Sequence, residues 1–219
     1  MCSVAITNSD GIIACKELNE PNVHNRMVTI FVQDCLEQAG ISLEKIDAVA
    51  VSKGPGSYTG LRIGTSTAKG LCFAMDKPLL AVNTLQAMAA GFLQLHPQIS
   101  SDSLLCPMID ARRMEVFTAF FDTKGEFTKE TAADIIDETS YQEELSKGPV
   151  YFFGDGAAKC KTALNNLNAV FIDHFFPSAR FAAALALQAF ANKQFENTAY
   201  FEPFYLKDFV ATTPKNSIQ

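Results

Sequence analysis

The sequence predicts an α/β protein whose two halves are built in a similar order. The apolar strand 48–51 runs into a glycine-rich turn and then a helix that ends near Met75. A second turn of this kind, 154–156, also joins a strand to a helix. Between them, the polar and proline-bearing stretch 96–103 separates two runs of strands and helices. Alternating strands and helices are typical of α/β domains, and 96–103 is the expected boundary.

The first half is predicted to contain a hairpin followed by strand–helix units. An apolar period near 3.6 residues predicts its first helix, opened by Pro21 and Asn22 and closed by Gly40. We expect Thr84 to cap the last helix, which ends near Leu95. The expected elements are the strands 2–7 and 12–18, the helix 23–39, the strand 48–51, the helix 60–75, the strand 79–83 and the helix 84–95.

The second half is predicted to open with three strands instead of two. The first half otherwise shows the same order, so we expect it to lack one strand at its start, and Met1 is then not expected to be the natural beginning of that domain. The expected elements are the strands 104–109, 116–121 and 127–136, the helix 141–145, the strand 150–153, the helix 157–167, the strand 170–173 and a helix capped by Ser178.

Length, composition and charge exclude several classes of protein. The chain has 219 residues and a net charge of −6, without a cluster of Lys and Arg, so binding nucleic acid alone is not expected. No apolar run approaches the roughly 18 residues of a membrane span, and no signal peptide is visible. Its 6 cysteines lie singly and without C-x-x-C pairs. They are expected to be small core residues in a reducing compartment, the cytoplasm.

The two glycine turns are the candidate sites for an anion or a nucleotide. Free backbone N–H groups and the helix dipole favour negative charge at such a turn, although the spacing is not that of a P-loop. Ser57 is interpreted as a turn residue, not as a nucleophile. Asp110 lies in a charged turn that is either a solvated hairpin or part of an inter-domain cleft. The candidate residues are Gly54, Gly56, Ser57, Thr59, Asp110, Gly154 and Gly156.

The helix after the first turn has one face with almost no side chains. Gly60, Gly64, Ala68 and Cys72 follow each other at intervals of four residues. Glycine inside a helix costs roughly 1 kcal/mol relative to alanine, so something is expected to approach this face closely. The two candidates are the protein's own sheet and a second protein chain.

Several motifs together resemble the bacterial TsaB (YeaZ) family. They are GPGSYTGLRIGTSTAKGL, then Val82-Asn83, IDARRMEVF, FFGDGA and PFYLK, which occur in this order over essentially the whole chain. The resemblance implies the actin/Hsp70-like ATPase (ASKHA) fold, with two RNase-H-like domains. We assign these to residues 1–100 and 101–219, with the tail packing back on the first domain.

The resemblance also implies a role in making N6-threonylcarbamoyladenosine at position 37 of tRNAs that read ANN codons. The chain is then the non-catalytic partner of its paralogue TsaD, with TsaE, an ATPase, as a further partner and homodimers also expected. It would meet tRNA only through the complex and would need no cofactor itself, with ATP or ADP acting at the level of the complex. The family's partner interface corresponds to His24, Met27, Phe31, Cys35, Gly60, Gly64, Ala68 and Cys72.

No catalytic or metal-binding residue is predicted in this chain. Its 3 histidines are not at metal-ligand spacing. The catalytic paralogue has two metal-binding histidines, and Thr84 and Met88 stand at these positions here. The alternatives are a glycoprotease-like metallopeptidase and a stand-alone ATPase or kinase of the ASKHA type. The missing histidines count against the metallopeptidase. The absence of the acidic-Thr turn with which family members usually begin counts against the ATPase or kinase.

Overall fold

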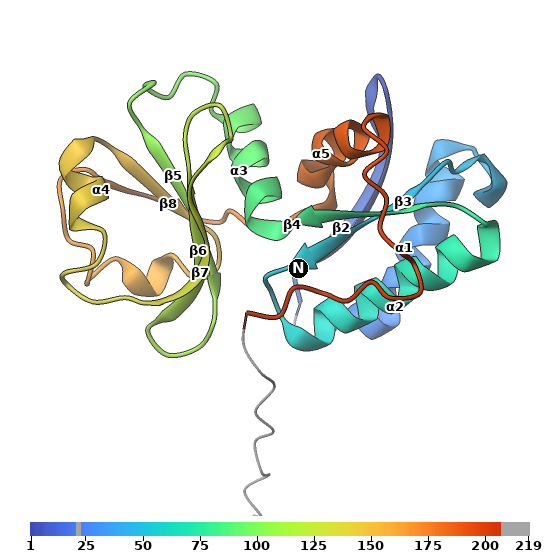
Figure 1. Cartoon of the computed structure of the whole chain (residues 1–219), viewed down its shortest axis with the longest axis horizontal. Helices are drawn as coiled ribbons and strands as arrows, with labels where there is room; N and C mark the ends of the chain where they lie inside the picture. Colours follow the sequence, from blue (N-terminus) through green and yellow to red (C-terminus); the bar gives the residue numbers. More distant parts are fainter. Residues whose placement is uncertain (21–22, 207–219) are drawn as a thin grey trace, which may run out of the picture.

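The computed structural model describes residues 1–20 and 23–206. Two groups of strands lie side by side, each flanked by helices, as Figure 1 shows. The helix opening predicted at Pro21 and Asn22 and the chain after Leu206, including the end of the PFYLK motif, lie outside the described residues.

The strands of the first half form two separate two-stranded sheets. β1 (Cys2–Asn8) and β2 (Gly11–Leu18) pair as an antiparallel hairpin. β3 (Val49–Gly54) and β4 (Leu79–Asn83) pair in parallel. Within the described ranges, no backbone hydrogen bond joins β1 to β3. The first half therefore has no continuous sheet, and the break falls between its hairpin and its parallel pair.

Three helices cover both faces of these strands. α1 (His24–Ala39) packs on β1 and β2, and α2 (Tyr58–Met75) packs mainly on β3. α5 (Ala179–Ala191) contacts all four strands, from the side opposite to α2 in Figure 1. The short 3-10 helix η1 (Leu43–Lys45) leads from α1 to β3. The helices therefore span the break that the strands leave open.

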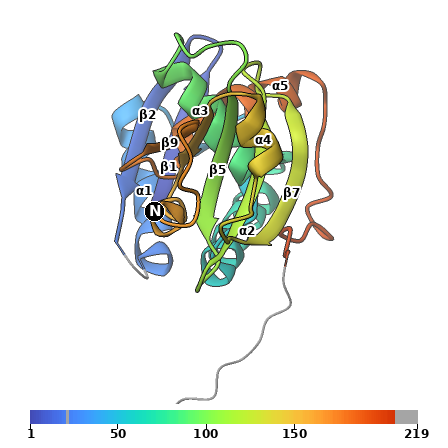
Figure 2. The ribbon, with the colours of Figure 1, turned by 90° about the vertical axis from the view of Figure 1, so that its left-hand side faces the viewer.

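The second half forms one five-stranded sheet, of which β5 and β7 stand in front in Figure 2. The strand order is β7-β6-β5-β8-β9, so β5 is central, antiparallel to β6 and parallel to β8. The elements are β5 (Leu104–Asp110), β6 (Glu115–Phe121), β7 (Phe127–Ile135), α4 (Gln142–Lys147), β8 (Val150–Phe153), η2 (Ala158–Cys160) and β9 (Ala169–Ile172).

The largest hydrophobic core joins the two halves. α3 (Thr84–Leu95) packs on β5 and β6, whereas α5 packs on the strands of the first half. Where these helices meet, Gly91 leaves no room for a side chain, because a Cβ there would lie 2.2 Å from Cγ of Phe181. Each of the predicted domains 1–100 and 101–219 thus places one helix on the strands of the other. The division into these two domains stays a prediction.

The segment 195–206 returns along the first half of the molecule. Glu196 N–H donates to the carbonyl of Leu79 at 2.8 Å. Lys69 Nζ on α2 donates to the carbonyls of Ala199 and Phe201, both at 3.1 Å. The segment therefore flanks α2, and in Figure 1 it runs beside this helix in red.

Two predicted details of the helices are wrong. The helix expected at 157–167 is only the single turn η2 with turns around it, and these end before Asn166, whose side chain binds the local backbone. Asn166 Oδ1 accepts from Asn168 N–H at 2.9 Å, and Asn168 Nδ2 donates to the carbonyl of Leu145 at 2.8 Å. The cap of α3 is Asn83 instead of Thr84, since Asn83 Oδ1 accepts from the N–H groups that follow it.

The cysteines are packed as expected for small core residues. Cys15 is half-buried, and the others are buried and free: Cys2, Cys35, Cys72, Cys106 and Cys160. Burial raises the pKa of the Cys106 thiol above its usual range. Among the described helices, none is long and apolar enough to cross a membrane.

Candidate functional site

The turn between β3 and α2 is held by its own serine and by the C-terminal segment. Ser57 Oγ accepts from Gly60 N–H at 3.4 Å, so Ser57 caps α2. Phe204 N–H donates to the carbonyl of Lys53 at 2.7 Å. Gly54 has a φ of 112°, and a Cβ there would lie 2.7 Å from the carbonyl oxygen of Phe204. Glycine is therefore required at position 54 by both the left-handed backbone and the close approach of the segment 195–206.

Close contact with β5 explains why the second turn contains glycines. Gly154 has a φ of 110°, and a Cβ there would lie 2.2 Å from the carbonyl oxygen of Met108. A Cβ on Gly156 would lie 2.9 Å from the carbonyl carbon of Ile109. Both glycines thus let the chain after β8 cross the end of β5.

The charged groups at the end of β5 are paired with each other. Asp110 forms an ion pair with Lys159 and accepts from Arg112 N–H at 3.0 Å. Asp155 Oδ1 accepts from Asp110 N–H at 3.0 Å. Lys159 also donates to the carbonyl of Glu115 at 2.7 Å. These local pairs favour the hairpin interpretation of the charged turn over the cleft interpretation.

The two predicted anion sites lie on different sheets. In residues 1–20 and 23–206 no hydrogen bond connects one set to the other, and no group of three His, Cys, Asp or Glu side chains is arranged to hold a metal. Gly56 and Thr59 lie in and just after the first turn, and Thr59 is exposed. Binding of an anion or nucleotide at either turn stays a prediction.

The small-residue face of α2 points largely into the protein itself. Ala68 and Cys72 are buried against β3, β4 and Phe201. A Cβ on Gly64 would lie 3.8 Å from Val51 Cγ2, and one on Gly60 would lie 3.4 Å from His24 Nε2. Ala68 and Cys72 are therefore buried within this chain, and their assignment to a partner interface stays a prediction.

The predicted interface residues on α1 are also partly or fully buried, and their role in an interface likewise stays a prediction. Phe31 and Cys35 are buried beneath β1 and β2, where Cys35 Sγ donates to the carbonyl of Val4 at 3.5 Å. His24 and Met27 are half-buried. The apolar period that reveals a helix marks first of all the side that faces its own sheet.

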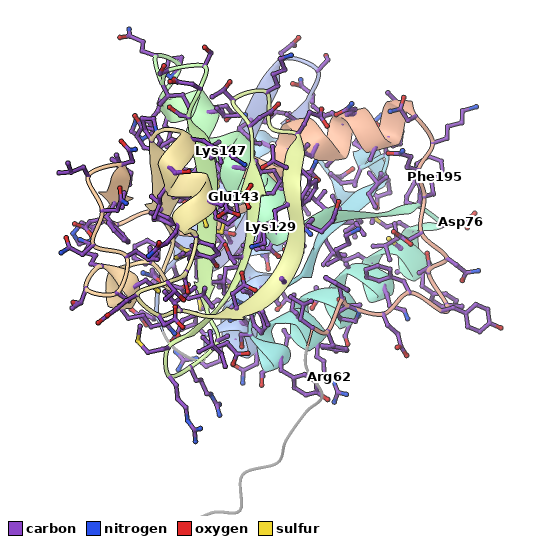
Figure 3. All side chains as sticks on the ribbon, turned by 60° about the vertical axis from the view of Figure 1, so that its left-hand side comes forward. Arg62, Asp76, Lys129, Glu143, Lys147 and Phe195 are labelled. Atoms are coloured by element: carbon purple, nitrogen blue, oxygen red, sulfur yellow. The ribbon has the colours of Figure 1, made fainter. Side chains whose placement is uncertain are left out.

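The side of α2 that faces outward also carries small residues, the feature that the sequence analysis assigned to the inward face. Gly70 has open space around it, and Phe73 is 88% exposed. Ser66, Gly70 and Ala74 also repeat at intervals of four and are exposed, which is a signal that the sequence analysis missed. We call Thr59, Ile63, Ser66, Gly70, Phe73 and Ala74 the outer α2 face. Figure 3 shows Arg62 and Asp76 near the two ends of this helix.

The two positions that correspond to the paralogue's metal ligands are buried packing positions here. Thr84 Oγ1 lies 2.5 Å from Ser52 Oγ and shares a hydrogen bond with it. Met88 is completely buried in the core that joins the halves. Both side chains already have neighbours inside the fold.

Comparison with known proteins shows to which family the chain belongs. The model of the family "TsaD: tRNA N6-adenosine threonylcarbamoyltransferase" matches residues 21–215. The "tRNA threonylcarbamoyladenosine biosynthesis protein TsaB" of Escherichia coli K12 is 31% identical over 96% of this chain and 91% of its own. The chain belongs to the TsaB family. The TsaB of Haemophilus influenzae is 30% identical over 95% of this chain and 90% of its own.

Solved structures agree with this assignment to the TsaB family. A structure titled "YeaZ from Pseudomonas aeruginosa" superposes with a TM-score of 0.78 at 25% identity, covering 94% of each chain. A second Pseudomonas aeruginosa structure, described as similar to the peptidase YEAZ, gives a TM-score of 0.80 at the same identity and coverage. The fold is therefore of the actin/Hsp70-like type, as the sequence resemblance implied.

Proposed function

We propose that this chain is a non-catalytic subunit of the machinery that makes N6-threonylcarbamoyladenosine in tRNA. The observation that carries the proposal is the match, over 96% of this chain, to a protein named for this biosynthesis. A threonylcarbamoyltransferase of Symbiobacterium thermophilum is 46% identical, but over only 32% of this chain and 21% of its own length. The proposal places the chain with tRNA in the cytoplasm.

Two features favour a non-catalytic role of this chain over a catalytic one. Thr84 and Met88 lack the imidazole groups that would bind a borderline metal, and both are engaged in packing. The net charge of −6 also favours a partner, instead of this chain, as the source of most phosphate contacts.

The partner in this proposal is a TsaD-type chain that docks on the outer α2 face. An exposed aromatic side chain beside small residues offers a partner helix both an anchor and close backbone approach. Phe73 would be the anchor, and Gly70 would allow the approach because a Cβ built there would meet nothing within 4 Å. TsaE and a second copy of this chain are the further partners that the proposal includes.

The test is light scattering after size exclusion, with this chain mixed with TsaD from the same organism. We expect a one-to-one complex for the unchanged chain. Gly70→Leu and Phe73→Ser should each weaken it by at least about 30-fold, the effect of an interface hot spot. Leu167→Ser is the matched control for Phe73→Ser, because Leu167 is also a highly exposed apolar residue but lies on the other half of the molecule.

The two parts of the proposal can fail separately. Normal binding by both α2 variants would exclude the outer α2 face as the interface but leave the function standing. Unchanged threonylcarbamoyladenosine in the tRNA of cells that lack this chain, measured by nucleoside mass spectrometry, would exclude the function itself.

A further inference from the structure

A cavity lies where the two halves of the molecule meet. Its volume is about 490 Å³, within the range of roughly 300–1,000 Å³ that small-molecule sites occupy. α3 and α5, which contact each other and lie side by side in Figure 1, both line it. The turn 124–126 between β6 and β7 also lines it, as does β4 at Ala81 and Val82. Both halves therefore contribute to the walls of one cavity.

The apolar part of the lining belongs to the core that joins the halves. Leu93 on α3 and Leu185 on α5 are half-buried and pack against this core. Ala90 and Ala189 line the cavity from the same two helices. Because alanine has only a methyl group, these positions leave space between the helices for a ligand.

Polar side chains from three segments surround the same space. In the described part of the chain, their side-chain nitrogen and oxygen atoms have no hydrogen bond or ion pair. They are Gln86 on α3, Gln188 and Asn192 on α5, Gln194 just after α5, and Lys124 and Glu126 on the β6–β7 turn. The cavity therefore offers donors and acceptors that the described residues leave unused.

Main-chain contacts hold the β6–β7 turn in place. Asp122 Oδ1 accepts from the N–H groups of Lys124 and Glu126, at 2.8 and 2.9 Å. Gly125 has a φ of 83°, and a Cβ there would lie 3.6 Å from Leu93 Cδ1 on α3. The turn thus keeps its shape without the side chains of Lys124 and Glu126, which remain available to a ligand.

The end of α5 brings Gln194 to the cavity. Lys193 has a left-handed backbone, with a φ of 54°. The N–H of Gln194 donates to the carbonyl of Ala189 at 2.9 Å, and the N–H of Lys193 donates to that of Phe190 at 3.0 Å. A left-handed residue at this position turns the chain back over the last turn of the helix. Gln194 therefore lines the same cavity as Gln188 and Asn192.

The charges of the lining define the ligand. Lys124 supplies one positive charge and Glu126 one negative charge, so a ligand that satisfies both carries a carboxylate and an ammonium group. Carboxamide side chains both donate and accept hydrogen bonds, which suits an uncharged polar group on the rest of the ligand. A phosphate would meet one lysine beside a carboxylate, whereas phosphate is best bound by Arg or Lys without a competing negative charge.

We propose that this cavity binds a free α-amino acid with an uncharged polar side chain. The ligand's carboxylate pairs with Lys124, its ammonium group pairs with Glu126, and the carboxamides, among them Gln86, hold its side chain. The ligand would touch elements of both halves at once, so its binding stabilises their arrangement. This site is separate from the outer α2 face, and the proposal does not rest on the proposed function.

The first experiment is equilibrium dialysis of the chain against radiolabelled L-glutamine, L-asparagine, L-serine and L-threonine, each tested alone. We expect saturable binding of at least one of them, with a Kd below about 1 mM. Two analogues of the amino acid that binds serve as competitors: its α-amide, which lacks the carboxylate, and its 2-hydroxy acid, which lacks the ammonium group. Each should compete at least about tenfold more weakly, because a charge-assisted hydrogen bond is lost.

The protein variants are Lys124→Met and Glu126→Gln. Each removes one charge from an exposed side chain and should weaken binding at least about tenfold. Lys45→Met and Glu44→Gln are the matched controls, because Glu44 and Lys45 are also exposed but do not line the cavity. Thermal unfolding checks that all variants are folded. The amino acid should raise the midpoint of the unchanged chain and of both controls, but not that of Lys124→Met at the same concentration.

Three results would overturn the proposal. The first is no saturable binding of any of the amino acids up to about 10 mM, a concentration at which a ligand with a Kd near 1 mM nearly saturates its site. The second is unchanged binding by both Lys124→Met and Glu126→Gln, which would place the amino acid elsewhere on the chain. The third is equal competition by the α-amide and the 2-hydroxy acid, since the two charges would then not be recognised.

Discussion

The side chain of Asn83 connects the β3–β4 sheet to the five-stranded sheet through Thr131. Asn83 Oδ1 caps α3 by accepting from the N–H groups of Leu85 and Gln86, at 2.8 and 3.1 Å. Its Nδ2 donates to Thr131 Oγ1 on β7 at 3.1 Å. One residue at the end of β4 therefore starts the helix that enters the second half and also binds that half.

These two roles of Asn83 can be separated by substitution. Thr131→Val removes the acceptor of Asn83 Nδ2 but leaves the cap of α3 intact, and should cost about 0.5–1.5 kcal/mol. Asn83→Ala loses the cap as well, which adds about 1 kcal/mol. Urea unfolding measures both free energies. Equal stability of the two variants would show that the cap contributes nothing.

Two helical glycines should respond in opposite ways to alanine. Gly91→Ala places a methyl group against the ring of Phe181 at the crossing of α3 and α5, and overpacking of this kind costs about 1–3 kcal/mol. Gly70→Ala meets nothing within 4 Å and should stabilise the chain by about 0.5–1 kcal/mol. Thermal unfolding of both variants checks this, and a stabilised Gly91→Ala would contradict the close contact.

His24 should make the chain less stable in acid. Burial lowers the pKa of His24 below its usual range. Above a pH of about 6.5 the residue is neutral in both the folded and the unfolded chain. As the pH falls below this value, the unfolded chain binds the proton first, so the free energy of unfolding decreases. His24→Gln should reduce this decrease between acid and neutral pH in urea titrations, and an unchanged pH profile would contradict it.

Lys69 should hold the C-terminal segment on α2. Lys69→Met keeps the apolar part of the side chain but removes both hydrogen bonds to the carbonyls of Ala199 and Phe201. We expect faster proteolysis within 195–206 and little change in global stability, because a local opening exposes the segment without unfolding the core. Lys45→Met is the control on an exposed lysine far from this segment in the sequence. Cleavage at the same rate in both variants would contradict the role of Lys69.

Sequence patterns predicted most of the elements, because hydrophobic period and turn chemistry act locally. The strand 79–83 and the helix 84–95 have the predicted bounds. The pattern failed at 157–167, where the chain forms only η2 and turns before Asn166 binds the local backbone. It also could not show that α3 and α5 would each pack on the sheet of the other half, because such long-range packing leaves no local signal.

The sequence by itself determined the α/β class, the order of the elements, the family motifs and the presence of small residues at four-residue intervals on α2. Tertiary structure alone decided which of the two small-residue rows faces outward, since a helical period marks a stripe but not the neighbour that covers it. It placed Ala68 and Cys72 against the strands and left Gly70 and Phe73 exposed. It also separated β1 from β3, because strand pairing depends on which backbone edges meet in space.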